Sequence, residues 1–424
     1  MTAGTTASTV ESSTESSPEG PASAPLPAFP MPRTDPLDPP PALAELRRSG
    51  QALTRVRLWD GSTSWLATRH ADVRAVLHSP HFSSDTSREG FPKATAAAAA
   101  LAAGGGGTRW LVRMDPPDHT VIRRMIGKEF TAGRVAAMRP MVERITQELL
   151  DELLARPERS ADLLTALGLP LPATVICLIL GVPAEDREFF QDKTYTAMSA
   201  NASPEEVGRA FGELLAYLDA LVREKEARPT DDLLGRLVVD QVRPGALSHE
   251  DLLGIARLLL IAGHDTTANM VGLTGLSLAQ HPEQAARLRA DPTLVPGAVE
   301  ELLRYHSVGN HGLSRIATAD VEIGGQLVRA GEGVLLSLNS ANRDAAVFER
   351  PDELDLSRSA PQHLAFGAGI HRCLGVPLAV LELEVVLEAL VRRLPGLRLA
   401  VPLEELSFRH DMLTYGVRAL PVTW

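Results

Sequence analysis

The chain has 424 residues, a formal net charge of −11 at pH 7 and two cysteines, Cys177 and Cys373. This length suffices for one large or two average domains without disulfide staples, and the acidic balance excludes nucleic acid or an anionic membrane as the main partner. No run of about twenty apolar residues predicts a membrane span, and two distant cysteines predict no disulfide framework, so we expect a cytoplasmic protein.

The N-terminal region is rich in Ser, Thr, Ala, Pro and Glu and lacks the basic start and apolar run of a signal peptide. We therefore expect residues 1–28 to form a disordered tail. The first predicted elements are a short helix, two strands that form a hairpin around Asp60-Gly61, and a second helix. Their predicted bounds are Pro41–Ser49, Thr54–Leu58, Ser64–Thr68 and His70–His78.

The stretch Ser83–Trp110 is of low complexity, with an alanine run at 96–100 and a glycine run at 104–107. We interpret it as a loop. It is either a surface loop without a function or a lid over a substrate cavity, because long loops in compact domains are often functional.

The next predicted helix begins near Pro117 and Asp118, which suit a first helical turn. His119 and Arg123 are four residues apart and project from one face of it. This pair could bind an anionic group or simply form a solvated face. Further on, two predicted helices, Phe189–Ala200 and Glu205–Lys225, are separated by a break at Asn201–Pro204.

A long helix is predicted over His249–Gln280, with Ser248 as its N-cap and His281-Pro282 as its end. Its middle is apolar on every face, as in a helix that crosses a large core. There the sequence Ala262-Gly263-His264-Asp265-Thr266-Thr267 combines several poor helix formers. Thr266 could bond the Ala262 carbonyl, and Asp265 supplies a carboxylate for proton transfer; the alternative is a structural kink.

Beyond this helix, Glu301 and Arg304 form an i, i+3 pair, Val321–Ile323 and Gly333–Leu338 are predicted strands, and residues 408–424 are predicted to form a strand-turn-strand. Near the C-terminus, Phe366-Gly367-Ala368-Gly369-Ile370-His371-Arg372-Cys373-Leu374-Gly375 precedes a predicted helix over Val376–Leu394. A thiol at a helix N-terminus is predicted to ionise readily. The alternative is a buried packing cysteine.

The pattern Phe-Gly-x-Gly-x-His-x-Cys-x-Gly resembles the haem-binding loop of the cytochrome P-450 family. Ala262–Thr267 resembles the oxygen-activation motif of that family, and Glu301-x-x-Arg304 resembles its core-locking Glu-x-x-Arg pair. The resemblance implies a mainly α fold with a small β-rich lobe, in a triangular prism whose long central helix crosses over the haem. It also implies that residues 29–424 form a single catalytic domain.

The same resemblance implies roles for individual residues. Cys373 would be the axial ligand of iron in haem b, Asp265 and Thr266 would manage protons for oxygen activation, and Glu301 and Arg304 would be structural. The implied cofactor-binding residues are His119, Arg123, Ala262, Gly263, Arg315, Phe366, Gly367, His371, Cys373 and Gly375. The implied substrate pocket comprises Leu258, Ala262, Val308, Leu313, Met412 and Leu413.

The implied activity is haem-thiolate monooxygenation of an apolar small molecule, a secondary metabolite or xenobiotic, by a monomer of the actinomycete-like class. Gly367–Arg372 is not a dinucleotide fingerprint, so electrons would come from a ferredoxin and its reductase, which would dock near Arg124, Lys128 and Arg372. Two other classes stay open: a haem-thiolate sensor or peroxide-driven peroxygenase, and a cysteine hydrolase that uses Cys373 with His371 or another histidine as base.

Overall fold

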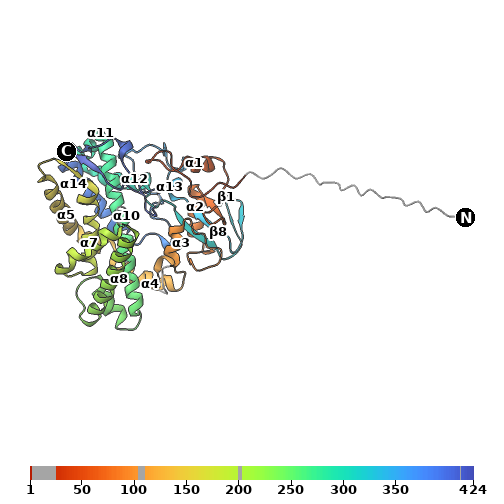
Figure 1. Ribbon diagram of the computed structural model, residues 1–424, viewed down its shortest axis with the longest axis horizontal. Helices are drawn as coiled ribbons and strands as arrows, with labels where there is room; N and C mark the ends of the chain where they lie inside the picture. Colours follow the sequence, from red (N-terminus) through yellow and green to blue (C-terminus); the bar gives the residue numbers. More distant parts are fainter. Residues whose placement is uncertain (2–24, 104–109, 199–202, 411) are drawn as a thin grey trace.

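The computed structural model describes residues 1, 25–103, 110–198, 203–410 and 412–424. A helical part and a smaller part with most of the strands lie side by side (Figure 1). The helices are α1 (Pro41–Arg48), α2 (His70–His78), α3 (Ala96–Ala103), α4 (Asp118–Gly127), α5 (Ala132–Leu154), α6 (Pro170–Leu180), α7 (Arg187–Met198), α8 (Pro204–Ala227), α9 (Leu233–Leu237), α10 (His249–Gln280), α11 (Pro282–Ala290), α12 (Val295–His306), α13 (Leu338–Ala341) and α14 (Val376–Arg393). The predicted mainly α fold with a small β-rich lobe is confirmed.

The largest sheet has five strands in the order β1-β2-β8-β5-β3, with β2 and β8 parallel and the other pairs antiparallel. A three-stranded sheet (β4-β10-β9) and a hairpin (β6-β7) complete the described strands. Their bounds are β1 (Leu53–Arg57), β2 (Thr63–Ala67), β3 (Phe82–Ser83), β4 (Ser160–Asp162), β5 (Leu313–Ala317), β6 (Val321–Ile323), β7 (Gln326–Val328), β8 (Gly333–Leu336), β9 (Arg398–Leu399) and β10 (Pro421–Thr423).

The long helix α10 has the predicted bounds, His249–Gln280. Ser248 and Asp251 form a capping box at its start, which satisfies backbone N–H groups that a helix N-terminus leaves unpaired. The helix contacts α6, α8 and α14 and runs through the helical part in Figure 1. Residues of α10 belong to the largest core cluster. This agrees with the prediction from the apolar middle of the helix.

Two predictions differ from the structure. Residues 96–103, expected in a loop, form helix α3, because alanine has the highest helix propensity of all residues. The predicted strand-turn-strand of residues 408–424 is reduced to a single bridge between Phe408 and Val417, and β10 pairs with β4 and β9 instead. The glycine run 104–107, Asn201 and most of the predicted tail lie outside the described residues.

Helix α14 carries a buried carboxyl, Glu382, which is 3% exposed. Its Oε2 has no hydrogen-bond partner among the described residues, and burial raises the pKa of Glu382 to about 8. The folded protein therefore binds a proton that the unfolded chain releases above its ordinary pKa of 4.5. Stability consequently falls as pH rises above that value.

We predict that Glu382→Gln stabilises the protein at pH 7 and leaves stability unchanged below pH 4.5. The gain at pH 7 should be at most about 3 kcal/mol, since one pKa unit corresponds to ~1.4 kcal/mol. Urea unfolding at several pH values measures it, with the half-buried Glu388→Gln on the same helix as control. A gain that does not change with pH would contradict the assignment.

Candidate functional site

The loop before α14 is held by its own backbone. The N–H of Gly367 donates to the Leu364 carbonyl at 2.8 Å, and the N–H of Cys373 donates to the Phe366 carbonyl at 2.9 Å. Gly369 has φ +69°, and a Cβ there would lie 2.1 Å from the carbonyl oxygen of Leu77. Only glycine fits at this position, because it combines positive φ with close backbone approach.

Cys373 is exposed, as are Ile370 and Arg372 of the same loop, whereas Leu364 and Ala368 pack in a core cluster. Burial is the largest effect on the pKa of its thiol and raises it. The backbone N–H groups of Gly375 and Val376 and the charges of Arg123 and Arg372 act in the opposite direction. The prediction of a readily ionised thiol is therefore wrong for the chain by itself, because desolvation exceeds the helix-terminus effect. A bound metal cation reverses this, since a coordinating thiol is deprotonated outright.

The segment Ala262–Thr267 lies within the continuous helix α10, without the kink that was the alternative, and it is accessible on one side. Ala262 and Thr266 are exposed, whereas His264 and Thr267 are buried. Thr266 Oγ1 donates to the Ala262 carbonyl oxygen at 2.7 Å, as the sequence predicts. A Cβ on Gly263 would lie 3.0 Å from Ile176 Cδ1, so this glycine is needed for packing of α10 on α6. Its predicted contact with a flat ligand stays a prediction.

Asp265 does not stand alone. Its Oδ1 accepts a hydrogen bond from Arg409 Nη1 at 2.7 Å and one from Asn269 Nδ2 at 3.2 Å. Arg409 is 5% exposed and comes from the C-terminal segment. The sequence analysis missed it, because an arginine 144 residues away carries no local signal. The guanidinium and the amide therefore hold the carboxylate in place.

A cluster of nitrogen-bearing side chains contains His119 of α4, Arg315 of β5 and His371 of the loop. The rings of His119 and His371 are 4.2 Å apart, and neither ring nitrogen of His119 has a hydrogen-bond partner among the described residues. Burial and mutual repulsion lower the pKa of His371 to about 3, and burial lowers that of Arg315 to about 10. Asp115 is the acidic group that acts against these shifts.

This cluster fits an anionic cofactor. Buried nitrogens without partners cost free energy, and carboxylates beside them would supply both acceptors and opposite charge. The propionates of haem are such carboxylates, and the exposed Cys373 offers an axial ligand for its iron. The residues present therefore fit haem. Arg123, predicted to bind a propionate with His119, donates instead to the Arg372 carbonyl oxygen at 2.5 Å.

The predicted pocket residues come from α10 and from two further stretches that the structure joins. The N–H of Tyr415 donates to the Val308 carbonyl at 2.7 Å, and the N–H of Asn310 donates to the Leu413 carbonyl at 3.0 Å. Leu413 is 41% exposed. Leu258, Val308, Leu313 and Met412 are half-buried, as pocket-lining side chains would be. Gly375 and Phe366 are half-buried as well.

The pair Glu301 and Arg304 is fully buried. Arg304 donates through Nε and Nη2 to the two carboxylate oxygens at 2.7 and 2.8 Å. Arg358, which the sequence analysis did not single out, donates to Glu301 Oε1 at 3.1 Å. Arg304 also donates to the Asn342 carbonyl oxygen, and Asn342 Oδ1 accepts from the N–H of Leu364 at the start of the cysteine loop. The buried pair thus supports that loop.

Comparison with known proteins gives consistent results. A family model described as Cytochrome P450 matches residues 52–395. The chain is 51% identical over 390 residues to cytochrome P450-SU2 of Streptomyces griseolus, which covers 92% of this chain and 94% of the relative. It is 46% identical over 404 residues to vitamin D3 dihydroxylase of Streptomyces griseolus, covering 95% and 98%.

Among solved structures, GfsF of Streptomyces halstedii superposes with a TM-score of 0.89 at 44% identity, covering 94% of this chain and 100% of that one. The residues that the family model matches include the cysteine loop and α10. The chain therefore belongs to the cytochrome P450 family and is a haem-thiolate monooxygenase with haem b as its cofactor.

Proposed function

We propose that Cys373 is the axial ligand of the haem iron, and that His119, Arg315 and His371 bind the propionates. The observation that carries this proposal is the exposed thiol of Cys373 on the same loop as His371. The His371 ring lies 4.2 Å from that of His119, whose two buried nitrogens lack hydrogen-bond partners among the described residues. Haem, when bound, supplies oxygen activation and transfer of one oxygen atom to the substrate. The protein supplies the thiolate, the fit to the propionates and the handling of protons.

We assign proton handling to Asp265 and Thr266. The Thr266 hydroxyl is exposed on the open side of α10 and is anchored at the Ala262 carbonyl. Asp265, held by Arg409, places a carboxylate one residue away. Departure of that carboxylate from Arg409 would let it take up a proton from water and pass it toward Thr266.

The substitution Thr266→Ala should lower the yield of product per electron consumed, because the anchored hydroxyl that donates protons is lost. General acid catalysis typically contributes about a hundredfold or more, so we expect a several-fold loss of coupling at least. Product and electron consumption are measured together. Thr274→Ala on the same helix, whose hydroxyl has no partner among the described residues, is the control. Unchanged coupling in Thr266→Ala would refute the assignment.

The reaction class is tested with the haem-loaded protein. Turnover driven by a reductase and a ferredoxin in the presence of dioxygen is expected, whereas turnover with peroxide alone would identify the peroxygenase alternative. A reduced carbonyl complex with the absorption of a histidine-ligated haem would overturn the Cys373 assignment. The cysteine-hydrolase alternative has no support, because the chain belongs to the cytochrome P450 family.

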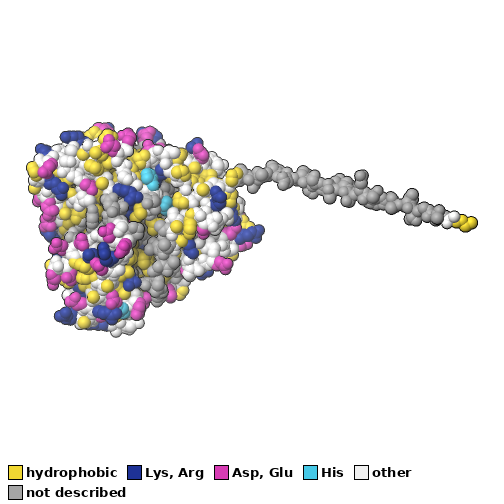
Figure 2. Space-filling view, in the orientation of Figure 1, with side chains coloured by type: hydrophobic (Ala, Val, Ile, Leu, Met, Phe, Trp, Pro, Cys, Tyr) yellow, Lys and Arg dark blue, Asp and Glu magenta, His cyan; other side chains and the backbone are white. Residues whose placement is uncertain are grey.

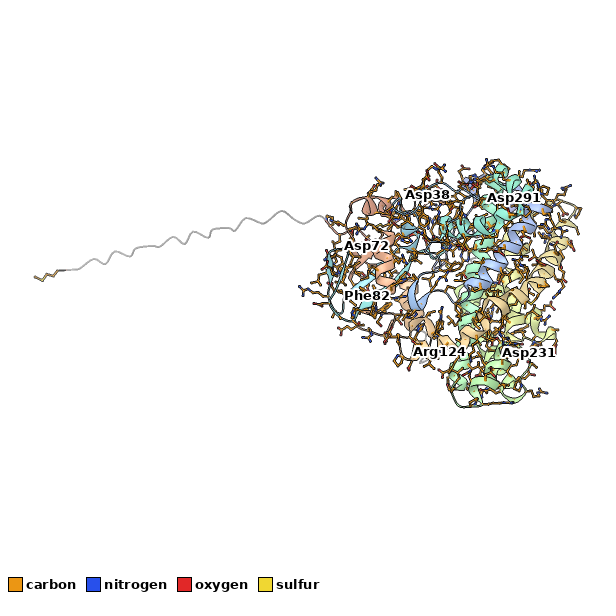
Figure 3. The ribbon with its side chains drawn as sticks, turned by 180° about the vertical axis from the view of Figure 1, so that it is seen from behind. Asp38, Asp72, Phe82, Arg124, Asp231 and Asp291 are labelled. Atoms are coloured by element: carbon orange, nitrogen blue, oxygen red, sulfur yellow. The ribbon has the colours of Figure 1, made fainter. Side chains whose placement is uncertain are left out.

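We propose an acidic ferredoxin as the electron donor, docking on Arg124, Lys128 and Arg372. All three are exposed, and Arg124 lies on α4 in the view of Figure 3. Ile370, also on the cysteine loop, is 53% exposed and offers an apolar contact. Acidic and basic side chains are otherwise mixed over the face shown in Figure 2.

Reversing the three charges (Arg124→Glu, Lys128→Glu, Arg372→Glu) should slow reduction by the ferredoxin about tenfold or more at low salt, because charge complementarity speeds encounter. The difference should disappear at high salt. Stopped-flow reduction measures it. Arg144→Glu, Arg223→Glu and Arg228→Glu, which change equally exposed arginines, form the control. Equal rates for both triple variants would remove this docking face.

We further propose that residues 29–424 form one catalytic domain that acts as a monomer in the cytoplasm on an apolar small molecule. Phe29 and Met31 are buried in a cluster with Leu43 and Val56, which supports a domain start near residue 29. None of the helices in the described part of the chain combines the length and apolar character that a bilayer crossing needs. A relative is named a vitamin D3 dihydroxylase, which supports hydroxylation of a bulky apolar compound.

A further inference from the structure

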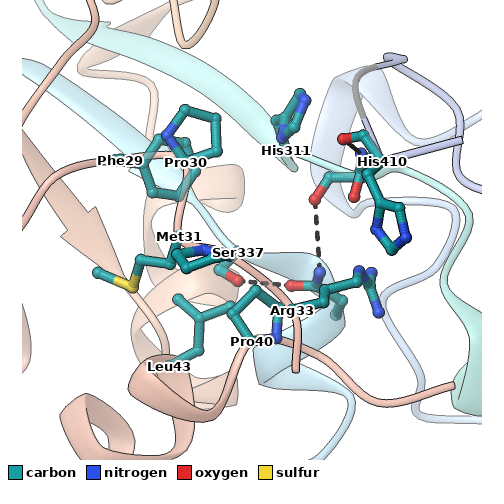
Figure 4. Close-up of a pocket in the computed structure, with 12 residues that line it drawn as sticks. Phe29, Pro30, Met31, Arg33, Pro40, Leu43, His311, Ser337 and His410 are labelled. Carbon is teal, nitrogen blue, oxygen red and sulfur yellow. Dashed lines mark hydrogen bonds between the residues drawn. The ribbon is translucent and has the colours of Figure 1, made fainter. Parts of the chain in front are cut away.

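A cavity lies between residues 29–43, which follow the N-terminal tail, and the two stretches around residues 310 and 410 that hydrogen bonds join. Its empty volume is about 470 Å³, including the part open to solvent. Figure 4 shows Phe29, Pro30, Met31 and Leu43 on one side of it and His311 and His410 on the other. The cavity is therefore amphipathic: one wall is apolar, and the other carries nitrogen-bearing side chains.

Two lining side chains carry a buried nitrogen without a hydrogen-bond partner among the described residues, Arg33 Nη2 and His311 Nε2. The Arg33 guanidinium is fixed by other contacts. It lies 3.9 Å from the centre of the Tyr415 ring, and its Nη1 donates to the Asp38 carbonyl oxygen at 2.5 Å. Its Nη2 therefore remains a buried donor without an acceptor, while the rest of the guanidinium is held in place.

The charge around the cavity is positive. The twelve described lining residues include one arginine and two histidines and no acidic side chain. Burial lowers the pKa of both Arg33 and His311, and the Arg33 charge lowers that of His311 further. An anion in the cavity would relieve this repulsion and provide the acceptor that the guanidinium lacks.

We propose that this cavity binds the carboxylate of a small organic acid, with Arg33 and His311 on the carboxylate and Phe29, Met31 and Leu43 around a short hydrocarbon part. A carboxylate is favoured over phosphate because the apolar wall would leave a fully hydrated phosphate partly desolvated without compensation. The cavity shares no lining residue with the cluster of His119, Arg315 and His371. It is thus a site separate from the proposed propionate contacts.

The joined stretches separate this cavity from α10. His410 lines the cavity, whereas its neighbour Arg409 bonds Asp265 of α10, and Gly416 lies against Asn269. The acid could therefore be a separate small molecule or the polar end of the substrate itself. Both ligands present the same carboxylate, and the length of the hydrocarbon chain of the acid that binds distinguishes a separate molecule from the substrate.

The test is a calorimetric titration of the haem-loaded protein with acetate, butanoate, hexanoate and inorganic phosphate. We expect affinity to rise about fourfold per added methylene and hexanoate to bind much more tightly than phosphate. Arg33→Gln should weaken hexanoate binding roughly tenfold or more, since hydrogen bonds to charged groups are the strong ones. Arg48→Gln, an exposed arginine on α1 outside the cavity lining, should leave it unchanged.

Arg33→Lys is the second variant, because it keeps the positive charge and so tests whether Arg33→Gln merely disturbs folding. It loses the paired N–H donors of the guanidinium and should bind hexanoate with intermediate affinity. Absence of hexanoate binding to the wild type, equal binding by all variants, or phosphate binding as tight as that of hexanoate would overturn the proposal. The heats of hexanoate binding do not depend on oxygen transfer. An error in the proposed haem-binding residues would instead appear in the absorption spectrum of the reduced carbonyl complex.

The source of the carboxylate is read from the haem spin state with carboxylates of six to sixteen carbons as probes. If the acid is the end of the substrate, longer members shift the spin state, and Arg33→Gln weakens that shift. If the acid is a separate molecule, hexanoate binds and no chain length shifts the spin state. Either result supports the site and identifies its ligand.

Discussion

The substitution Cys373→Ser is expected to abolish the thiolate signature of the reduced carbonyl complex and to lower monooxygenase turnover by about a hundredfold or more, which corresponds to roughly 3 kcal/mol of barrier. The physical reason is the ligand atom. A thiolate donates electron density to iron and favours O–O cleavage, whereas a serine hydroxyl does not. The loop itself should persist, because the Cys373 N–H bond to Phe366 and the glycine turns do not involve the sulfur.

The matched control is the other cysteine. Cys177 lies fully buried in α6, and burial raises the pKa of its thiol to about 12, so it is an inert packing residue. Cys177→Ala should keep the spectrum and the turnover while losing some stability. If the thiolate signature survives in Cys373→Ser and disappears in Cys177→Ala, Cys177 rather than Cys373 is the iron ligand.

The substitution Arg304→Gln is expected to destabilise the fold by about 3–5 kcal/mol, the usual cost of removing one partner of a buried ion pair. It would leave the Glu301 carboxylate buried with only the Arg358 side chain and the backbone N–H of Asp355 as donors. It would also remove the bonds to the Asn342 and Pro351 carbonyl oxygens. Haem retention should fall too, since Asn342 holds Leu364 at the start of the cysteine loop.

Urea unfolding and the haem content of the purified protein measure this effect. The exposed pair Arg144 and Glu148 on α5 provides the comparison, because its charged groups lie 3.0 Å apart with side chains about 60% exposed. Arg144→Gln should cost less than about 1 kcal/mol. If the two substitutions prove equally mild, the buried pair has no part in supporting the loop.

The sequence predicted much of the fold because the signals concerned are local. The bounds of α10 follow from a capping box at one end and His281-Pro282 at the other. The turn before Cys373 follows from glycines where the backbone has positive φ. The alanine-rich stretch was misjudged because low complexity was taken as a loop signal, although alanine propensity favours the helix α3 that forms there.

The site needed the tertiary structure wherever a property depends on partners far along the chain. Arg409 reaches Asp265 across 144 residues, and Arg358 reaches Glu301 across 57. The raised pKa of the Cys373 thiol depends on burial by the whole fold, and the cluster of His119, Arg315 and His371 forms only when three distant segments meet. The sequence by itself determined the motifs from which the site residues are proposed, because motif and helix signals are short-range. Packing decided their ionisation and their partners, because desolvation and Coulomb interactions depend on distance in space.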